Sequence, residues 1–107
     1  MLSLCIGNIS VRVVDGPNKA SGYVELLYSG VWGTICSEKW DRNDALVICR
    51  MLGYNDASVK NKKKIKLAAE QMWLGEVECT GKENSITECK HSDWGYECSY
   101  EAAELYC

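Results

Sequence analysis

The sequence contains one proline, no phenylalanine and one histidine, and these shortages exclude several classes of protein. One proline and nine glycines among 107 residues do not fit a collagen-like or low-complexity chain. No apolar run reaches the roughly 20 residues that cross a bilayer, so no membrane-spanning helix is predicted. A formal net charge of -3 gives no overall attraction to nucleic acid or anionic lipid. We therefore expect no nucleic-acid partner, and membrane attachment only through other parts of the parent protein.

The sequence motifs of common enzymes are also missing. The chain has no phosphate-binding glycine loop, no His-Glu-x-x-His and no Gly-x-Ser-x-Gly. A nucleophile–base pair would depend on His91 alone. His91 follows Cys89-Lys90 directly, in a segment that a bridge would fix, which favours a surface or hydrogen-bonding role. The sequence predicts a protein that is not an enzyme and requires no cofactor.

Cysteine, by contrast, is abundant. A chain of 107 residues with 47 % hydrophobic and 25 % charged residues is typical of one folded domain. Seven cysteines are more than a reduced cytosolic domain of this size carries, and the short Cys-x-x-Cys spacings of zinc sites are absent. They lie at positions 5, 36, 49, 79, 89, 98 and 107. A disulfide framework in an oxidising compartment is predicted, with one cysteine left over, although the count does not choose the pairing.

The first half of the chain predicts strands followed by a helix. Residues 11–13 alternate before a turn at 15–18, and residues 23–28 and 31–36 form a hairpin. Asp41 caps a helix, with Asp44 three residues later, and Gly53 ends it. Its apolar stripe recurs at helical spacing, which turns Cys49 inward and suits a buried bridge. The stripe comprises Ala45, Ile48, Cys49 and Leu52.

The second half predicts loops, short strands and one further short helix. Residues 55–71 are interpreted as a solvated loop or edge strand, and residues 72–79 as a strand. Ser85 and Glu88 form a capping box that opens a short helix carrying Cys89. One good helix among several short strands indicates an α+β fold.

Segments spread over residues 11–107 carry a resemblance to a known family. They are Val-Arg-Val-Val-Asp-Gly at 11–16, Gly-Tyr-Val-Glu-Leu at 22–26, Gly-Val-Trp-Gly-Thr-Ile-Cys at 30–36, Trp-Asp at 40–41, Val-Ile-Cys-Arg-Met-Leu-Gly at 47–53, Trp-Leu at 73–74, Val-Glu-Cys-Thr-Gly at 77–81 and Trp-Gly at 94–95. In this order and spacing they resemble the scavenger receptor cysteine-rich (SRCR) domain. The resemblance implies a curved antiparallel β-sheet that cradles one α-helix. Residues 1–10 are then an N-terminal extension or linker.

The resemblance also implies a pairing of the cysteines. Ala20 and Tyr54 stand where the eight-cysteine group of the family has two more cysteines, so the chain is similar to group A, with six framework cysteines. The family pattern implies the bridges Cys36–Cys98, Cys49–Cys107 and Cys79–Cys89. Cys5 lies outside this pattern and is either free or paired with an absent segment or another chain, and we favour an interdomain or intermolecular role.

The resemblance further implies an extracellular binding module of a secreted or cell-surface protein. Family members bind polyanions, microbial surfaces, glycans or partner proteins. The alternative is a structural spacer or subunit-assembly domain that joins its neighbours through Cys5 and its termini. Asn8-Ile9-Ser10 is a glycosylation sequon, which fits secretion.

Two groups of charged residues are candidate ligand sites. The resemblance implies a calcium-like cation at an acidic cluster, whose matching positions here are Glu38, Glu97 and Glu101, with Ser37 in place of one acid. The alternative is that these three glutamates are ordinary solvated side chains. A basic patch could hold polyanions, although the family's second-strand arginine is Tyr23 here and a solvated lysine loop is the alternative. The patch comprises Lys60, Lys62, Lys63, Lys64 and Lys66.

The four tryptophans are interpreted as core residues rather than as a sugar-stacking set. They are Trp32, Trp40, Trp73 and Trp94.

Overall fold

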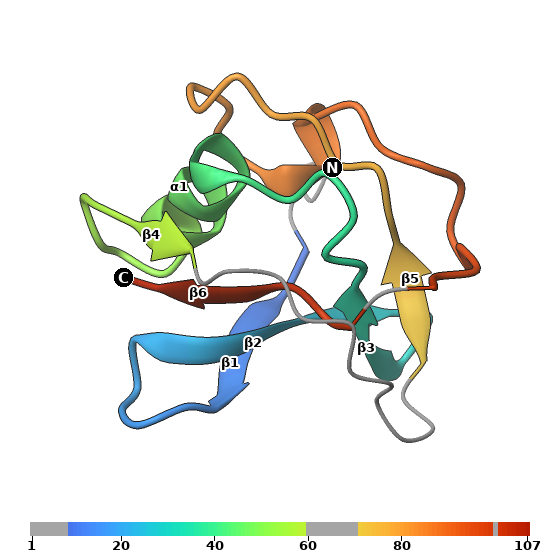
Figure 1. Ribbon diagram of the computed structural model, residues 1–107, viewed down its shortest axis with the longest axis horizontal. Helices are drawn as coiled ribbons and strands as arrows, with labels where there is room; N and C mark the ends of the chain where they lie inside the picture. Colours follow the sequence, from blue (N-terminus) through green and yellow to red (C-terminus); the bar gives the residue numbers. More distant parts are fainter. Residues whose placement is uncertain (1–8, 60–70, 100) are drawn as a thin grey trace, which may run out of the picture.

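A curled, mixed β-sheet holds a single α-helix on one of its faces (Figure 1). The computed structural model describes residues 9–59, 71–99 and 101–107. The strands run in the order β4 (Ser58–Val59), β6 (Glu104–Tyr106), β2 (Ser21–Tyr28), β3 (Val31–Ile35) and β5 (Met72–Leu74), and β1 (Val11–Asp15) also pairs with β2. The helix α1 spans Arg42–Met51, and a short 3-10 helix, η1, spans Ile86–Glu88. The α+β class is confirmed.

The predicted hairpin forms because successive side chains of β2 point to opposite faces of the sheet. Val24 and Leu26 are fully buried, whereas Glu25 points to the other face and pairs with Arg12 of β1. Arg12 also lies over the ring of Trp32, with its guanidinium carbon 3.9 Å from the ring centre. Trp32 therefore lies on the face opposite the core, and the prediction that it is a core residue is wrong.

The sheet is not purely antiparallel. β3 and β5 pair in parallel, with Thr34 opposite Met72 and Ile35 opposite Leu74. A parallel pair requires a crossover, which the chain makes through α1. β5 stops at Leu74, although a strand was predicted over 72–79. Gly75 lies directly against the ring of Tyr96, and the chain then turns at Glu76, where φ is 50°.

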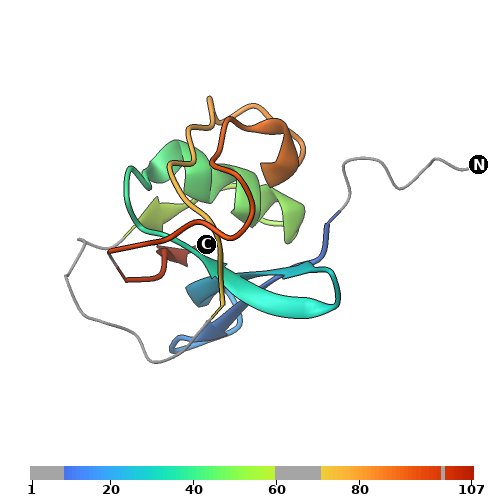
Figure 2. The same ribbon diagram turned by 90° about the vertical axis from the view of Figure 1, so that its right-hand side faces the viewer.

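The predicted helix is confirmed at both ends. The Asp41 side chain accepts the Asp44 N–H, and the Asp44 side chain accepts the Asp41 N–H, which completes the capping box. Gly53 follows the C-cap residue with φ of 95°, a conformation that glycine adopts without strain. Figure 2 shows α1 and η1 on the same side of the sheet. Between the helix and the sheet lies the core, whose fully buried members include Val24, Leu26, Ile35, Val47, Ile48, Leu74, Val77, Ile86 and Leu105.

The second helix is a single 3-10 turn, and only part of its predicted capping box forms. Ser85 caps η1 by accepting the Thr87 N–H at 3.3 Å. The Glu88 carboxylate accepts the N–H of Asn84 at 3.1 Å, one residue before the cap. Cys89 follows as the C-cap residue.

Three disulfides fasten these elements together, in the pairing that the resemblance implies. Cys36–Cys98 joins the end of β3 to the last long loop, with a sequence separation of 62. Cys49–Cys107 joins α1 to the residue after β6, with a separation of 58. Cys79–Cys89 closes a loop with a separation of 10. The C-terminal part of the chain is thus tied to β3 and α1.

The packed domain begins before the boundary expected from the sequence. The Ser10 carbonyl accepts the Leu27 N–H at 3.0 Å, and Ile9 packs against the core. The described residues therefore include two positions that the sequence assigned to an N-terminal extension. Within the same residues, the helices are too short or too polar to cross a bilayer.

Candidate functional site

The three glutamates predicted to bind a cation do not gather into one site. Glu38 accepts a hydrogen bond from the Tyr96 hydroxyl at 2.6 Å. Glu101 is buried, and its carbonyl accepts the Ser37 N–H at 3.0 Å, while Glu97 is exposed. The disulfide Cys36–Cys98 brings their segments to the same end of the molecule without placing the three carboxylates within 4.8 Å of one another.

A calcium ion needs six to eight oxygen ligands, several of them carboxylates. Among the described residues, the Ser37 hydroxyl is buried without a hydrogen-bond partner, so one oxygen at this end is available. One hydroxyl and separated glutamates do not make such a shell. The arrangement therefore does not fit a calcium site.

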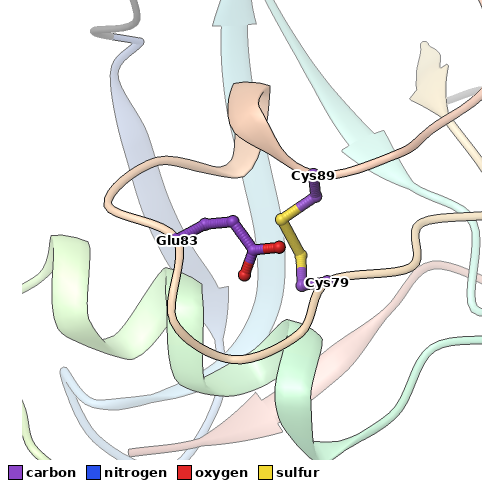
Figure 3. A group of neighbouring side chains, drawn as sticks. All are labelled: Cys79, Glu83 and Cys89. Carbon is purple, nitrogen blue, oxygen red and sulfur yellow. A yellow bond between two sulfur atoms is a disulfide. The ribbon is translucent and has the colours of Figure 1, made fainter.

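A different group brings potential metal ligands within 4.8 Å of one another in the described part of the chain: Cys79, Glu83 and Cys89 (Figure 3). The two sulfur atoms form the Cys79–Cys89 disulfide and cannot serve as thiolate ligands. The Glu83 carboxylate accepts the N–H groups of Thr80 and Gly81 at 2.9 and 3.0 Å. Burial raises the pKa of Glu83, and the hydrogen bonds from Thr80 and Gly81 lower it. Together the hydrogen bonds have the larger effect, so the pKa of Glu83 lies below its ordinary value. The group closes a loop rather than binding a metal.

Asp44 joins this bridged loop to α1. Its carboxyl group is fully buried and accepts the Cys79 N–H at 2.8 Å through one oxygen and the Asp41 N–H at 2.9 Å through the other. Burial raises the pKa of Asp44 to about 7, although the two N–H groups act in the opposite direction. The sequence predicted the cap, but the contact with Cys79, 35 residues away, has no local signal.

Arg50, in the last turn of α1, holds the other side of the same loop. Its guanidinium donates to the carbonyl of Glu83 at 2.7 Å and to the carbonyl of Gly81 at 2.5 Å. Asp44 and Arg50 therefore join the 79–89 loop to both ends of the helix.

An aromatic cluster is made of Tyr28, Trp73, Trp94 and His91. Trp73 belongs to β5, the strand that Figure 1 shows on the side of the molecule away from α1. The rings of Tyr28 and Trp94 are stacked, with centres 3.9 Å apart and planes within 2°. Trp73 meets the Tyr28 ring edge-on at 5.0 Å. Gly33 permits this arrangement, since a Cβ atom there would lie 2.5 Å from the Trp73 ring.

The tryptophans thus differ in burial. Trp40 is 4 % exposed and belongs to the core, as predicted. Trp73 and Trp94 are half-buried and pack against the edge of the core, while Trp32 lies on the opposite face. Trp32 pairs with Leu27, whose neighbour Leu26 points into the core, so strand alternation turns Trp32 to the other face.

Several predicted site residues lie outside the described part of the chain. They are Cys5, Asn8, Lys60, Lys62, Lys63, Lys64 and Lys66. His91, in contrast, is described: it is half-buried, and its Nδ1 atom lies 2.6 Å from the Ser92 carbonyl oxygen. This geometry agrees with the hydrogen-bonding role expected for it.

Comparison with known proteins agrees with this architecture. The model of the scavenger receptor cysteine-rich domain matches residues 14–107. The chain is 40 % identical over 94 residues to the bovine "Macrophage scavenger receptor types I and II", covering 86 % of this chain and 21 % of the receptor. It therefore spans about a fifth of that relative.

Two solved structures have the same fold. The third SRCR domain of murine neurotrypsin has a TM-score of 0.73 and 34 % identity, covering 94 % of this chain and 96 % of that one. The SRCR domain of mouse MARCO, solved in a dimeric form, has a TM-score of 0.69 and 37 % identity, covering 88 % and 89 %. With its three disulfides, its curled sheet and its single helix, the chain belongs to the scavenger receptor cysteine-rich domain family.

Proposed function

We propose that this chain is the extracellular ligand-binding module of a receptor-like protein and that it belongs to group A of the family. The observation that carries the proposal is the framework of six cysteines in three disulfides, found in a chain that is 40 % identical to a macrophage scavenger receptor. Such bridges persist in oxidising compartments outside the cell. The group A assignment is supported by Ala20 and Tyr54, which stand where the eight-cysteine group of the family has its two additional cysteines.

Binding rather than catalysis is also supported by the polar groups of the scaffold. His91 is the one histidine of the chain, so a nucleophile–base pair that uses a histidine would depend on it alone. The buried Asp44 is engaged by two backbone N–H groups at the helix cap. The carboxyl group of Asp44 therefore holds the fold.

The charges of the chain favour polyanions as one ligand class. Five of the twelve Lys and Arg residues lie at 60–66, and Glu70 is the one acid among residues 60–70. The residues that the structure describes therefore carry seven basic and fourteen acidic side chains, which give them a formal charge of -7. Positive charge is concentrated in one segment of an otherwise acidic chain, and such a segment attracts polyanions in a salt-dependent manner.

The experiment is heparin affinity chromatography of the secreted domain. The variant with Lys62, Lys63 and Lys64 changed to Glu should pass through the column, whereas the wild type is retained and elutes with salt. The matched control changes Lys19, Lys82 and Lys90 to Glu, which alters the net charge equally in residues outside the segment. The control should remain retained.

Unaltered retention of the first variant would overturn the proposal that these lysines bind polyanions. Equal loss of retention in both variants would show that only net charge matters, and would overturn it as well.

A further inference from the structure

The two segments that the Cys36–Cys98 disulfide joins are also joined by a hydrogen bond. Glu38 lies two residues after Cys36, and Tyr96 lies two residues before Cys98. The Tyr96 hydroxyl donates to the Oε1 atom of Glu38 at 2.6 Å, across a sequence separation of 58. A short hydrogen bond to a carboxylate is stronger than one between neutral groups. The hydrogen bond and the disulfide therefore hold the same two segments together.

The ring of Tyr96 is fixed in place by its neighbours. A Cβ atom at Gly75 would overlap this ring, so the ring fills the space that a side chain there would need. The backbone of Gly75 is itself held, because its N–H donates to the Ser92 hydroxyl and its carbonyl accepts the Ser92 N–H, both at 2.9 Å. Gly95, directly before Tyr96, donates its N–H to the Trp73 carbonyl at 2.8 Å. Backbone contacts therefore determine the position from which Tyr96 presents its hydroxyl.

This hydrogen bond involves one of the glutamates at which the family resemblance implies a cation. The hydroxyl of Tyr96 directs its hydrogen at Glu38, and so supplies the positive end of a dipole to that carboxylate. Ser37 contributes a neutral hydroxyl in place of an acid, Glu97 is exposed and Glu101 is buried. These positions gather less negative charge around one point than a calcium ion requires.

We propose that the Glu38–Tyr96 hydrogen bond takes the place of the cation that the family resemblance implies, so that this end of the molecule is held without calcium. The bond joins the segment between β3 and α1 to the loop that precedes the last strand. One part of the inference rests on the proposed function: retention of the domain on a polyanion is then independent of calcium as well.

The test is thermal unfolding of the secreted domain in millimolar calcium and in EDTA, at equal ionic strength. The wild-type midpoint should be the same in both solutions. Tyr96→Phe keeps the ring against Gly75 and removes only the hydroxyl, so its midpoint should fall by about 4–8 °C in both. The matched control, Tyr54→Phe, removes a hydroxyl from a tyrosine that is 40 % exposed, and its midpoint should equal that of the wild type.

A double-mutant cycle separates the hydrogen bond from the other contacts of the two side chains. Glu38→Ala and Tyr96→Phe together should lower the midpoint by clearly less than the sum of the two single losses, because each single change removes the same bond. Losses that simply add would overturn the inference. A Tyr96→Phe midpoint equal to that of the wild type would overturn it as well.

The response to calcium is the other decisive result. A wild-type midpoint that rises in calcium would show that a cation binds and stabilises the fold, and would overturn the inference. Retention on heparin should be equal in calcium and in EDTA, and loss of retention in EDTA alone would contradict its second part. A chain that heparin retains in neither solution loses the proposed polyanion binding, whereas the midpoints still decide the role of the Glu38–Tyr96 hydrogen bond.

Discussion

The carboxyl group of Asp44 is buried where α1 meets the bridged loop, and it accepts the N–H groups of Asp41 and Cys79. Its pKa is raised to about 7 in the folded chain by burial, compared with about 4 in an unfolded chain. The folded state therefore binds this proton more tightly. The stability that Asp44 contributes is complete below about pH 4 and is lost as the pH rises to about 7.

The carboxyl groups of Asp56 and Glu83 affect the stability of the fold in a different pH range. The hydrogen bond from Arg42 lowers the pKa of Asp56, and the N–H groups of Thr80 and Gly81 lower that of Glu83. Their contribution is lost only as the pH falls below about 4, the usual range of a carboxyl group. The slope between about pH 4.5 and 7 therefore reports Asp44.

Urea unfolding at several pH values tests this assignment. In the wild type, the free energy of unfolding should fall as the pH rises from about 4.5 to 7. In Asp44→Asn this slope should vanish, and stability should drop by about 1–3 kcal/mol, because one amide NH2 group then faces a backbone N–H. The control Asp56→Asn, at an exposed ion pair with Arg42, should keep the wild-type slope. A slope retained in Asp44→Asn would refute the assignment.

At the scale of elements, local sequence signals were sufficient wherever one segment determines its own structure. The Asp41–Asp44 capping box, Gly53 at the helix end and the alternation over residues 23–28 predicted α1 and the hairpin correctly. The parallel pairing of β3 with β5 was not predictable, because it depends on the path of the intervening chain. The early end of β5 depends on Tyr96, a residue more than 20 positions away.

The three bridges should differ in the stability that they give to these elements. In the loop-entropy model, a bridge that closes about 60 residues contributes about 4 kcal/mol, and one that closes about 10 contributes nearer 3. Asp44 and Arg50 also hold the 79–89 loop without its bridge. The Cys79→Ala/Cys89→Ala double variant should therefore stay folded with a lower midpoint.

The Cys49→Ala/Cys107→Ala variant should lose more, because α1 is then joined to the C-terminal residue by packing alone. Thermal unfolding followed by circular dichroism compares the two variants directly. A larger loss for the short bridge would contradict the account, since the loop would then depend on its disulfide rather than on α1.

At the scale of the whole molecule, three disulfides hold the sheet and the helix together. The curved sheet with its single helix and the pairing of the six framework cysteines agree with what the sequence suggested through its resemblance to the family. The candidate cation site was less predictable. The family's acidic cluster matches the sequence positions of Glu38, Glu97 and Glu101. In the structure, however, Glu38 accepts a hydrogen bond from the Tyr96 hydroxyl, and Glu101 is buried. The direction of a side chain depends on its neighbours in the folded structure, and a match between sequence positions does not reveal it.

The central claim is that an oxidised, three-bridge scaffold presents binding surfaces outside the cell, and mass mapping tests it most directly. The domain is secreted from animal cells, alkylated without reduction, digested and analysed for cross-linked peptides. The account predicts peptides joined through Cys36–Cys98, Cys49–Cys107 and Cys79–Cys89. Alkylated framework cysteines, or peptides joined in another order, would contradict it.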